Sequence, residues 1–243
     1  MSALSDENGY YSFGFGEFSD SIRAGRYHLR VNPGWRNRNF SEYETWVNGP
    51  VGELVSLSTA RVHALPTSLP IAPLESGRSN VILASGDLQL DLTQAQVSFA
   101  DPRSGGEALA KLARSREIAF LGPKHLVAAF GYLVQPARTT VSGALRVSMK
   151  LPTSNGSYDY VPELGDWVAI VALDPVALQL VPVGVGRVDP ARLLIESRGV
   201  LDIRRLDFIG VVFSKPAQAS LEAYANGELD LAQLNSALMG AAQ

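Results

Sequence analysis

The stretch "DWVAIVALDPVALQLVPVGVGRVD", residues 166–189, contains two short apolar runs separated by the turn-forming tripeptide "LDP". A short apolar run bounded by turn formers is typical of a β-strand that is buried in a sheet. The stretch therefore predicts two strands joined by a turn at residues 173–175, and the sequence on either side of it extends the same pattern.

Strands are predicted in three neighbouring stretches. In the first, Leu88, Leu90 and Leu92 recur with the period of two that places side chains on one face of a strand. The three stretches are "NVILASGDLQLDLTQAQVSFADP" (80–102), "HLVAAFGYLVQPARTTVSGALRVSMKLP" (125–152) and "RLLIESRGVLDIRRLDFIGVVF" (192–213). Residues 80–215 are accordingly predicted to form one β-sandwich-like module.

Helical spacing is found in two places. In "GGEALAKLARSREIAF" (105–120), Leu109, Leu112 and Ala113 form an apolar stripe, which predicts a short covering helix over residues 105–116. The tail, residues 216–243, predicts two short helices divided by an Asn-Gly pair, with Asp230 as the N-cap of the second helix.

The first part of the chain is predicted to be a separate β-module. In "GRYHLRVNPG" (25–34), Tyr27, Leu29 and Val31 fall on one face of a strand, with basic residues on the other face. Residues 35–50 are predicted to form a long loop, rich in aromatic and charged residues, with a short edge strand. The segment that follows at 66–79 carries three prolines in eight residues and predicts a linker.

The predicted fold class is therefore all-β, with two β-sandwich-like modules, a short covering helix and a small C-terminal helical tail. A composition of 22 Gly and 14 Pro in 243 residues, rich in turn formers, agrees with that class. The predicted divisions are a first β-module (1–65), a linker (66–79), a second β-module (80–215) and a helical tail (216–243).

Charge and composition exclude several classes of partner. The net charge of −3 leaves no basic field that would neutralise phosphates, so nucleic acid is not an expected partner. The apolar runs are shorter than the roughly 20 residues of a membrane-spanning helix, so no membrane span is expected. The chain has no cysteine, which excludes disulfides and thiolate metal sites. Its first residues do not have the pattern of a secretory signal peptide.

The stretch "SDENGYYSFGFGEFSDSIRAGRYHLRV" (5–31) resembles the second half of a carboxypeptidase regulatory-like, transthyretin-like domain. In that family about half of the sandwich precedes this motif, whereas here only four residues do. We therefore expect the missing strands to come from residues 35–65, from another chain or from residues outside this sequence. The positions that carry the resemblance are Asp6, Gly9, Tyr11, Phe13, Gly25, Tyr27, Leu29 and Val31.

Residues 127–198 are similar to the plug-type β-sandwich that lies next to transthyretin-like domains in teneurins and bacterial YD-repeat shell proteins. This resemblance implies a scaffold in a large extracellular or toxin-like assembly, and no catalysis by these modules. The implied localisation is extracellular, on a cell surface, or in a virion. The matching positions are Leu133, Pro136, Val147, Pro152, Gly165, Asp174, Gly184, Gly186 and Val188.

The residues that usually carry chemistry do not form a recognisable motif. The three histidines, His28, His63 and His125, lie far apart without a zinc-binding spacing. The Gly-rich stretches at 13–18 and 184–189 are not followed by a helix, as a dinucleotide loop requires. No catalytic residue and no cofactor is therefore predicted. The carboxylates of one loop, Asp159, Glu163 and Asp166, could bind Ca²⁺ or simply be solvated.

A run of aromatic residues is the strongest candidate for a binding site. Trp35, Phe40, Tyr43 and Trp46 are interspersed with charged residues, and such aromatics occur in sandwich cores, protein interfaces and carbohydrate platforms. The predicted function is a non-enzymatic structural or interaction module that joins other protein subunits through β-edges, by strand addition, and through this aromatic surface. The alternative is a carbohydrate-binding module that uses the loop aromatics.

Overall fold

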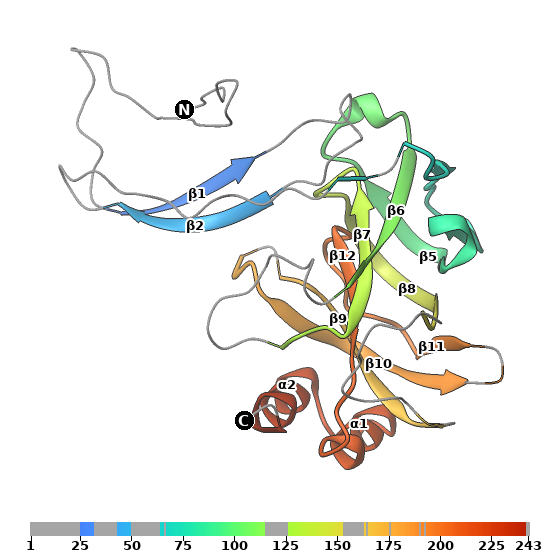
Figure 1. Ribbon diagram of the computed structural model, residues 1–243, viewed down its shortest axis with the longest axis vertical. Helices are drawn as coiled ribbons and strands as arrows, with labels where there is room; N and C mark the ends of the chain where they lie inside the picture. The colour runs from blue at the N-terminus through green and yellow to red at the C-terminus, as the bar shows by residue number, and fades with distance from the viewer. Residues whose placement is uncertain are drawn as a thin grey trace.

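The computed structural model describes residues 25–31, 43–49, 64–65, 67–114, 126–152, 163, 165–174, 176–189, 191 and 193–241. It shows one large sheet of ten strands, a separate sheet of two strands and two short helices near the C-terminus (Figure 1). Every pairing between the described strands is antiparallel. The prediction of an all-β fold with a helical tail is confirmed.

The large sheet is ordered β3-β6-β7-β12-β9-β10-β11-β8-β5-β4. Its two end strands, β3 and β4, lie close together, so the sheet curls into a nearly closed barrel. The strands are β3 (Ala72–Pro73), β4 (Val81–Leu83), β5 (Leu88–Ser98), β6 (Glu107–Arg114), β7 (Phe130–Gln135), β8 (Thr140–Lys150), β9 (Trp167–Leu173), β10 (Leu180–Asp189), β11 (Leu194–Arg198) and β12 (Phe208–Val212).

The apolar run "WVAIVAL" forms β9, which is buried on both of its faces. Successive side chains of a strand point to opposite faces of the sheet. Val168 and Ile170 pack in the inner core of the barrel, whereas Ala169 and Val171 pack in a second core on its outer face. The absence of polar alternation in this run therefore follows from the position of β9 in the middle of the sheet.

The outer core is covered by α1 (Gln218–Ala225) and α2 (Leu231–Ala241), which contact β9 and β10. Leu221 of α1 and Leu234 of α2 are fully buried in it. The predicted cap of the second helix is confirmed, because Asp230 Oδ1 accepts a hydrogen bond from the Gln233 amide at 2.8 Å. The Gln233 side chain in turn accepts one from the Asp230 amide at 2.9 Å, which completes a reciprocal capping pair.

A glutamine side chain joins α1 to the barrel. The Gln218 amide group accepts a hydrogen bond from Trp167 N at 2.9 Å and donates one to Trp167 O at 2.8 Å. Both backbone groups of the first residue of β9 are thus satisfied by a side chain, as they would be by a neighbouring strand.

The helix predicted over residues 105–116 is wrong, because this part of the chain forms β6. The strand pairs with β7 from Leu109 opposite Gln135 to Arg114 opposite Phe130. Ala108 is buried in the inner core, while Ala113 is buried in the outer core. A strand that is buried on both faces favours small apolar residues. Such residues also have a high helix propensity, and the pairing with β7 overrides that helix propensity here.

The stretch predicted as a Pro-rich linker, residues 66–79, contributes to the large sheet. It contains β3 at the end of the strand order, and Leu74 is only 1% exposed. Gly77 N donates a hydrogen bond to Leu92 O at 3.0 Å, while Leu92 N donates one to Arg78 O at 2.9 Å. The segment therefore lies along β5. Within the described ranges, no helix has the length and apolar character needed to cross a membrane.

A pH dependence of stability follows from Tyr224 on α1. Burial raises the pKa of this phenol above its usual value, and the negative charge of Asp202 acts in the same direction. A raised pKa means that folding favours the neutral phenol, so the contribution is complete below pH about 10 and is lost as the pH rises through the pKa in the folded protein. As the pH rises above about 10, urea unfolding should therefore show a larger loss of stability in the wild type than in Tyr224→Phe. Parallel curves for the two proteins would contradict this assignment.

Candidate functional site

The two-stranded sheet consists of β1 (Gly25–Val31) and β2 (Tyr43–Gly49), a hairpin with two unlike faces. Arg26, His28 and Arg30 alternate on one face of β1, with Trp46 directly opposite His28 on the same face. Tyr27, Leu29 and Val31 occupy the other face of β1, where Val47 is the residue opposite Tyr27. The first four residues of β1 are exposed, and the three basic residues are exposed as well.

Trp46 is the centre of the polar face of this hairpin. Its ring stacks on His28 with a centroid distance of 4.9 Å, and the guanidinium carbon of Arg26 lies 4.5 Å from its centroid. The indole Nε1 donates a hydrogen bond of 2.8 Å to the carbonyl oxygen of Val176. This bond ties β2 to the turn between β9 and β10, although the two residues are 130 positions apart in the chain.

The turn that receives Trp46 is shaped by an aspartate. Asp174 Oδ1 accepts hydrogen bonds from the backbone amides of Val176 at 2.8 Å and Ala177 at 2.6 Å. An Asx turn of this kind holds the backbone of these residues in one conformation. Val176 itself is 73% exposed, so its carbonyl group is accessible to the indole on the hairpin.

The bond between Trp46 and Val176 can be tested by Trp46→Phe, which removes the donor but retains an aromatic ring. A net loss of about 0.5–1.5 kcal/mol is expected for one hydrogen bond. Hydrogen exchange of the β1 and β2 amides should become faster by about 2-fold to 13-fold, while exchange in β9 stays unchanged. Equal acceleration in the hairpin and in β9 would instead show that Trp46 stabilises the whole fold.

Only two of the four predicted aromatic site residues lie in the part of the chain that the structure describes. Trp46 lies on β2 and is half-buried, and Tyr43 begins β2. Trp35 and Phe40 lie outside the described residues, so their predicted roles stay predictions. The sequence analysis named Trp46 as a candidate binding residue, but nothing in the sequence pointed to the turn at Val176.

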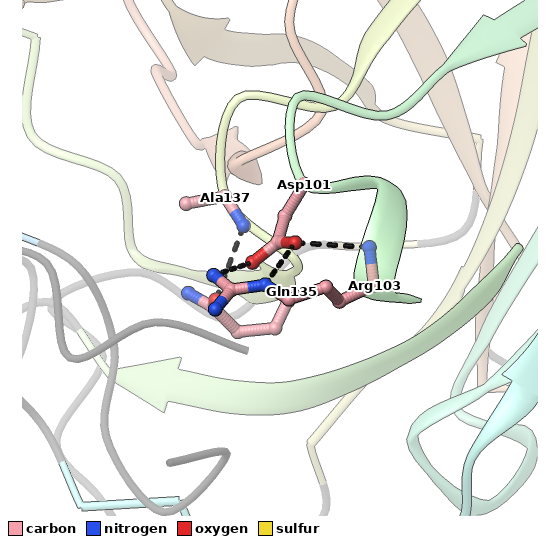
Figure 2. Close-up of polar contacts among 4 residues, drawn as sticks. All are labelled: Asp101, Arg103, Gln135 and Ala137. Carbon is pink, nitrogen blue, oxygen red and sulfur yellow. Dashed lines mark hydrogen bonds and ion pairs between the residues drawn. The ribbon is translucent and has the colours of Figure 1, made fainter. Parts of the chain in front are cut away.

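A second polar cluster, which the sequence analysis missed, lies where β5 connects to β6 and at the end of β7 (Figure 2). Asp101 accepts hydrogen bonds from Arg103 Nε at 2.8 Å and from its Nη2 at 2.6 Å. The hydrogen bonds to Asp101 raise the pKa of the Arg103 guanidinium. Beside them, Gln135 Oε1 accepts a hydrogen bond from Ala137 N at 3.1 Å. Each bond joins residues two positions apart, which is typical of loop stabilisation.

A buried ion pair lies in the connection to β12. Arg205 and Asp207 are each 7% exposed, and their side chains form a close ion pair. Asp207 also accepts a hydrogen bond from the backbone amide of Arg138, in the turn between β7 and β8. The pair thus connects two segments far apart in the sequence and has a structural role.

The predicted histidines and carboxylates are only partly described. His28 is in β1, and His63 and His125 lie outside the described residues. Asp166 Oδ2 accepts a hydrogen bond from Glu163 N at 2.7 Å within the loop before β9, while Asp159 is not described. Among the residues that the structure describes, no group of three or more His, Asp or Glu could hold a metal ion.

Comparisons of the chain with protein-family models, curated proteins and solved structures gave no match. The resemblances to transthyretin-like and plug-type domains therefore stay predictions from the sequence.

Proposed function

We propose that this chain is a non-enzymatic interaction module of a larger assembly, and that the hairpin β1–β2 is its binding element. The observation that carries the proposal is a two-stranded sheet, exposed along most of β1, beside a barrel that encloses its own core. An assembly at a bacterial surface, in a toxin shell or in a virion is the setting that fits the sequence resemblances.

Among the described residues, neither of the two cores includes a residue of β1 or β2. A partner can therefore bind the hairpin without disturbing the two cores of the barrel.

A two-stranded hairpin is marginally stable by itself in water. Backbone N–H and C=O groups at the edge of a sheet pair readily with another chain. Strand addition to such an edge is a common way in which β-modules join one another. Partner binding to β1 would supply the third strand that makes this sheet stable.

The proposal can be tested by cross-linking in the native source. A photo-reactive amino acid at Tyr27 on β1 should give adducts of one or a few discrete masses, and the same group at exposed Gln96 on β5 serves as a matched control. Recovery of the chain in particles well above 26.1 kDa, with adducts at Tyr27 alone, would support the proposal. Recovery solely as a free monomer without adducts would contradict it.

The second candidate is a carbohydrate-binding module, which the half-buried ring of Trp46 beside Arg26 and His28 favours. Aromatic rings next to hydrogen-bond donors are typical of sugar platforms. Binding on a glycan array that is lost in both Trp46→Ala and Trp35→Ala would replace the first candidate by this one.

A further inference from the structure

We propose that Asn226 is a deamidation site whose rate is controlled by the two helices that cover the barrel. The site is closed while α1 and α2 pack on the outer core, and it opens when they leave that core. The inference is independent of the proposed function, because it concerns the connection between the two helices and not the hairpin.

The chemistry of the site follows from the pair Asn226-Gly227. The backbone nitrogen of Gly227 can attack Cγ of the Asn226 side chain, so that a new C–N bond closes a succinimide ring. The bond from Cγ to the side-chain nitrogen then breaks, the Gly227 amide proton reaches that nitrogen through solvent, and ammonia leaves. Water opens the ring at either of its carbonyls and gives aspartate or isoaspartate, without an oxidant or a reductant.

The pair is accessible to the solvent that this reaction needs. Asn226 and Gly227 are both exposed, at the point where α1 ends. Glycine has no side chain that would hinder the attack of its own nitrogen.

In the folded chain, the attacking nitrogen is already engaged. Gly227 N donates a hydrogen bond to Tyr224 O at 3.0 Å, and Glu228 N donates one to Ala223 O at 2.9 Å. With the positive φ of 79° at Gly227, these two bonds form the Schellman motif that ends α1. The nitrogen of Gly227 can attack only after it gives up its proton, so the first of these bonds must break before the reaction.

The backbone angle of Asn226 also directs this nitrogen away from the side chain. Asn226 has φ −87° and ψ −3°. At a ψ near zero, the nitrogen of the next residue eclipses the residue's own backbone nitrogen and not Cβ. Ring closure therefore requires a large rotation about ψ of Asn226, which would break the Schellman motif as well.

The packing of the two helices keeps this motif in place. Leu221, Leu234 and Leu238 are buried in the outer core. The side chain of Gln218 bonds to both backbone groups of Trp167. Proteins open locally at lower free energies than those of global unfolding. Local opening of α1 and α2 is therefore the step that releases the nitrogen of Gly227.

The products of the reaction weaken the motif that protected the site. Aspartate at position 226 would place a negative charge at the C-terminal end of α1, where the helix dipole disfavours anions. It would also lie four residues after Glu222, and like charges at this spacing destabilise a helix. Isoaspartate would lengthen the backbone before Gly227 and displace its amide from Tyr224 O. Both products therefore favour the open state of the helices.

The test follows deamidation of the full chain in mildly alkaline buffer, folded and in denaturing urea, by peptide mapping with mass spectrometry. Asn226 should deamidate at least about tenfold more slowly in the folded chain than in urea. Asn226→Ser removes the reacting amide and serves to assign the signal. Equal rates in the two conditions, or no deamidation of Asn226 in urea, would overturn the inference.

Two truncations show which motion opens the site. Leu234→Ala removes an anchor of α2 and should raise the rate in the folded chain by about tenfold or more. Leu90→Ala, the same change in the inner core, is the matched control and should leave the rate unchanged. Equal acceleration would show that the site opens only when the barrel unfolds, and it would overturn the inference. Leu238→Val and Ile195→Val form a milder pair if circular dichroism shows that an alanine variant does not fold.

The effect of the product is measured by hydrogen exchange in Asn226→Asp. The α1 amides should exchange about twofold to tenfold faster than in the neutral variant Asn226→Ser. Equal exchange in the two variants would show that the new charge does not loosen the helix, and it would overturn this step of the inference.

Discussion

Phe208→Ala is expected to lower the free energy of unfolding by about 3–5 kcal/mol. The side chain is fully buried in the outer core, at the start of β12. Its ring covers two glycines, Gly131 on β7 and Gly210 on β12, which are directly opposite each other in the sheet. Truncation would leave a cavity beside these two glycines, which have no side chains to fill it. Chemical denaturation in urea measures the loss.

The two glycines provide a control. A Cβ added at Gly210 would lie 2.5 Å from Phe208 Cε1, so Gly210→Ala should be destabilising in the wild type and less so in Phe208→Ala. A Cβ at Gly131 would also meet the backbone oxygen of Ile209 at 2.6 Å, so Gly131→Ala should remain harmful in both backgrounds. A loss below about 1 kcal/mol for Phe208→Ala would show that the ring does not support the outer core.

Asp207→Ala should be equally damaging, with an expected loss of about 3–5 kcal/mol. The change leaves Arg205 buried without its close carboxylate partner, and it removes the acceptor of the Arg138 amide. Thermal unfolding followed by circular dichroism provides the measurement.

The exposed ion pair between Asp87 and Lys150, 3.3 Å apart, is the matched control for the buried one. Asp87→Ala should cost about 0–1 kcal/mol, because solvent screens this pair. Similar losses for Asp87→Ala and Asp207→Ala would contradict the structural role of the buried pair.

The sequence predicted the strands well where their signal is local. Alternation of leucines predicted β5, and the two apolar runs around "LDP" predicted β9 and β10. The tail helices and the Asp230 cap were predicted from equally local signals.

The prediction failed at β6, where the local preference and the tertiary environment disagree. Ala108 and Ala113 suit a helix as well as a strand that is buried on two faces. Pairing with the neighbouring β7 is what makes this segment a strand. The order of strands in the nearly closed sheet depends on contacts between distant segments, which periodicity does not encode.

In the candidate site, too, the local pattern was predicted from the sequence and the contacts between distant segments were not. Alternation along Gly25–Val31 predicted the two faces of β1 correctly. The pairing of His28 with Trp46 and the bond from Trp46 to Val176 join segments that have no common pattern in the sequence.

Hydrogen exchange of the full chain at neutral pH tests most directly whether the hairpin is an element separate from the barrel. We expect the amides of β7, β9 and β12 to exchange through global unfolding, and those of β1 to exchange about a hundredfold faster or more. Protection of β1 and β2 equal to that of β9 would contradict this account, because the hairpin would then be part of the barrel's cooperative unit and its edge would not be available to a partner.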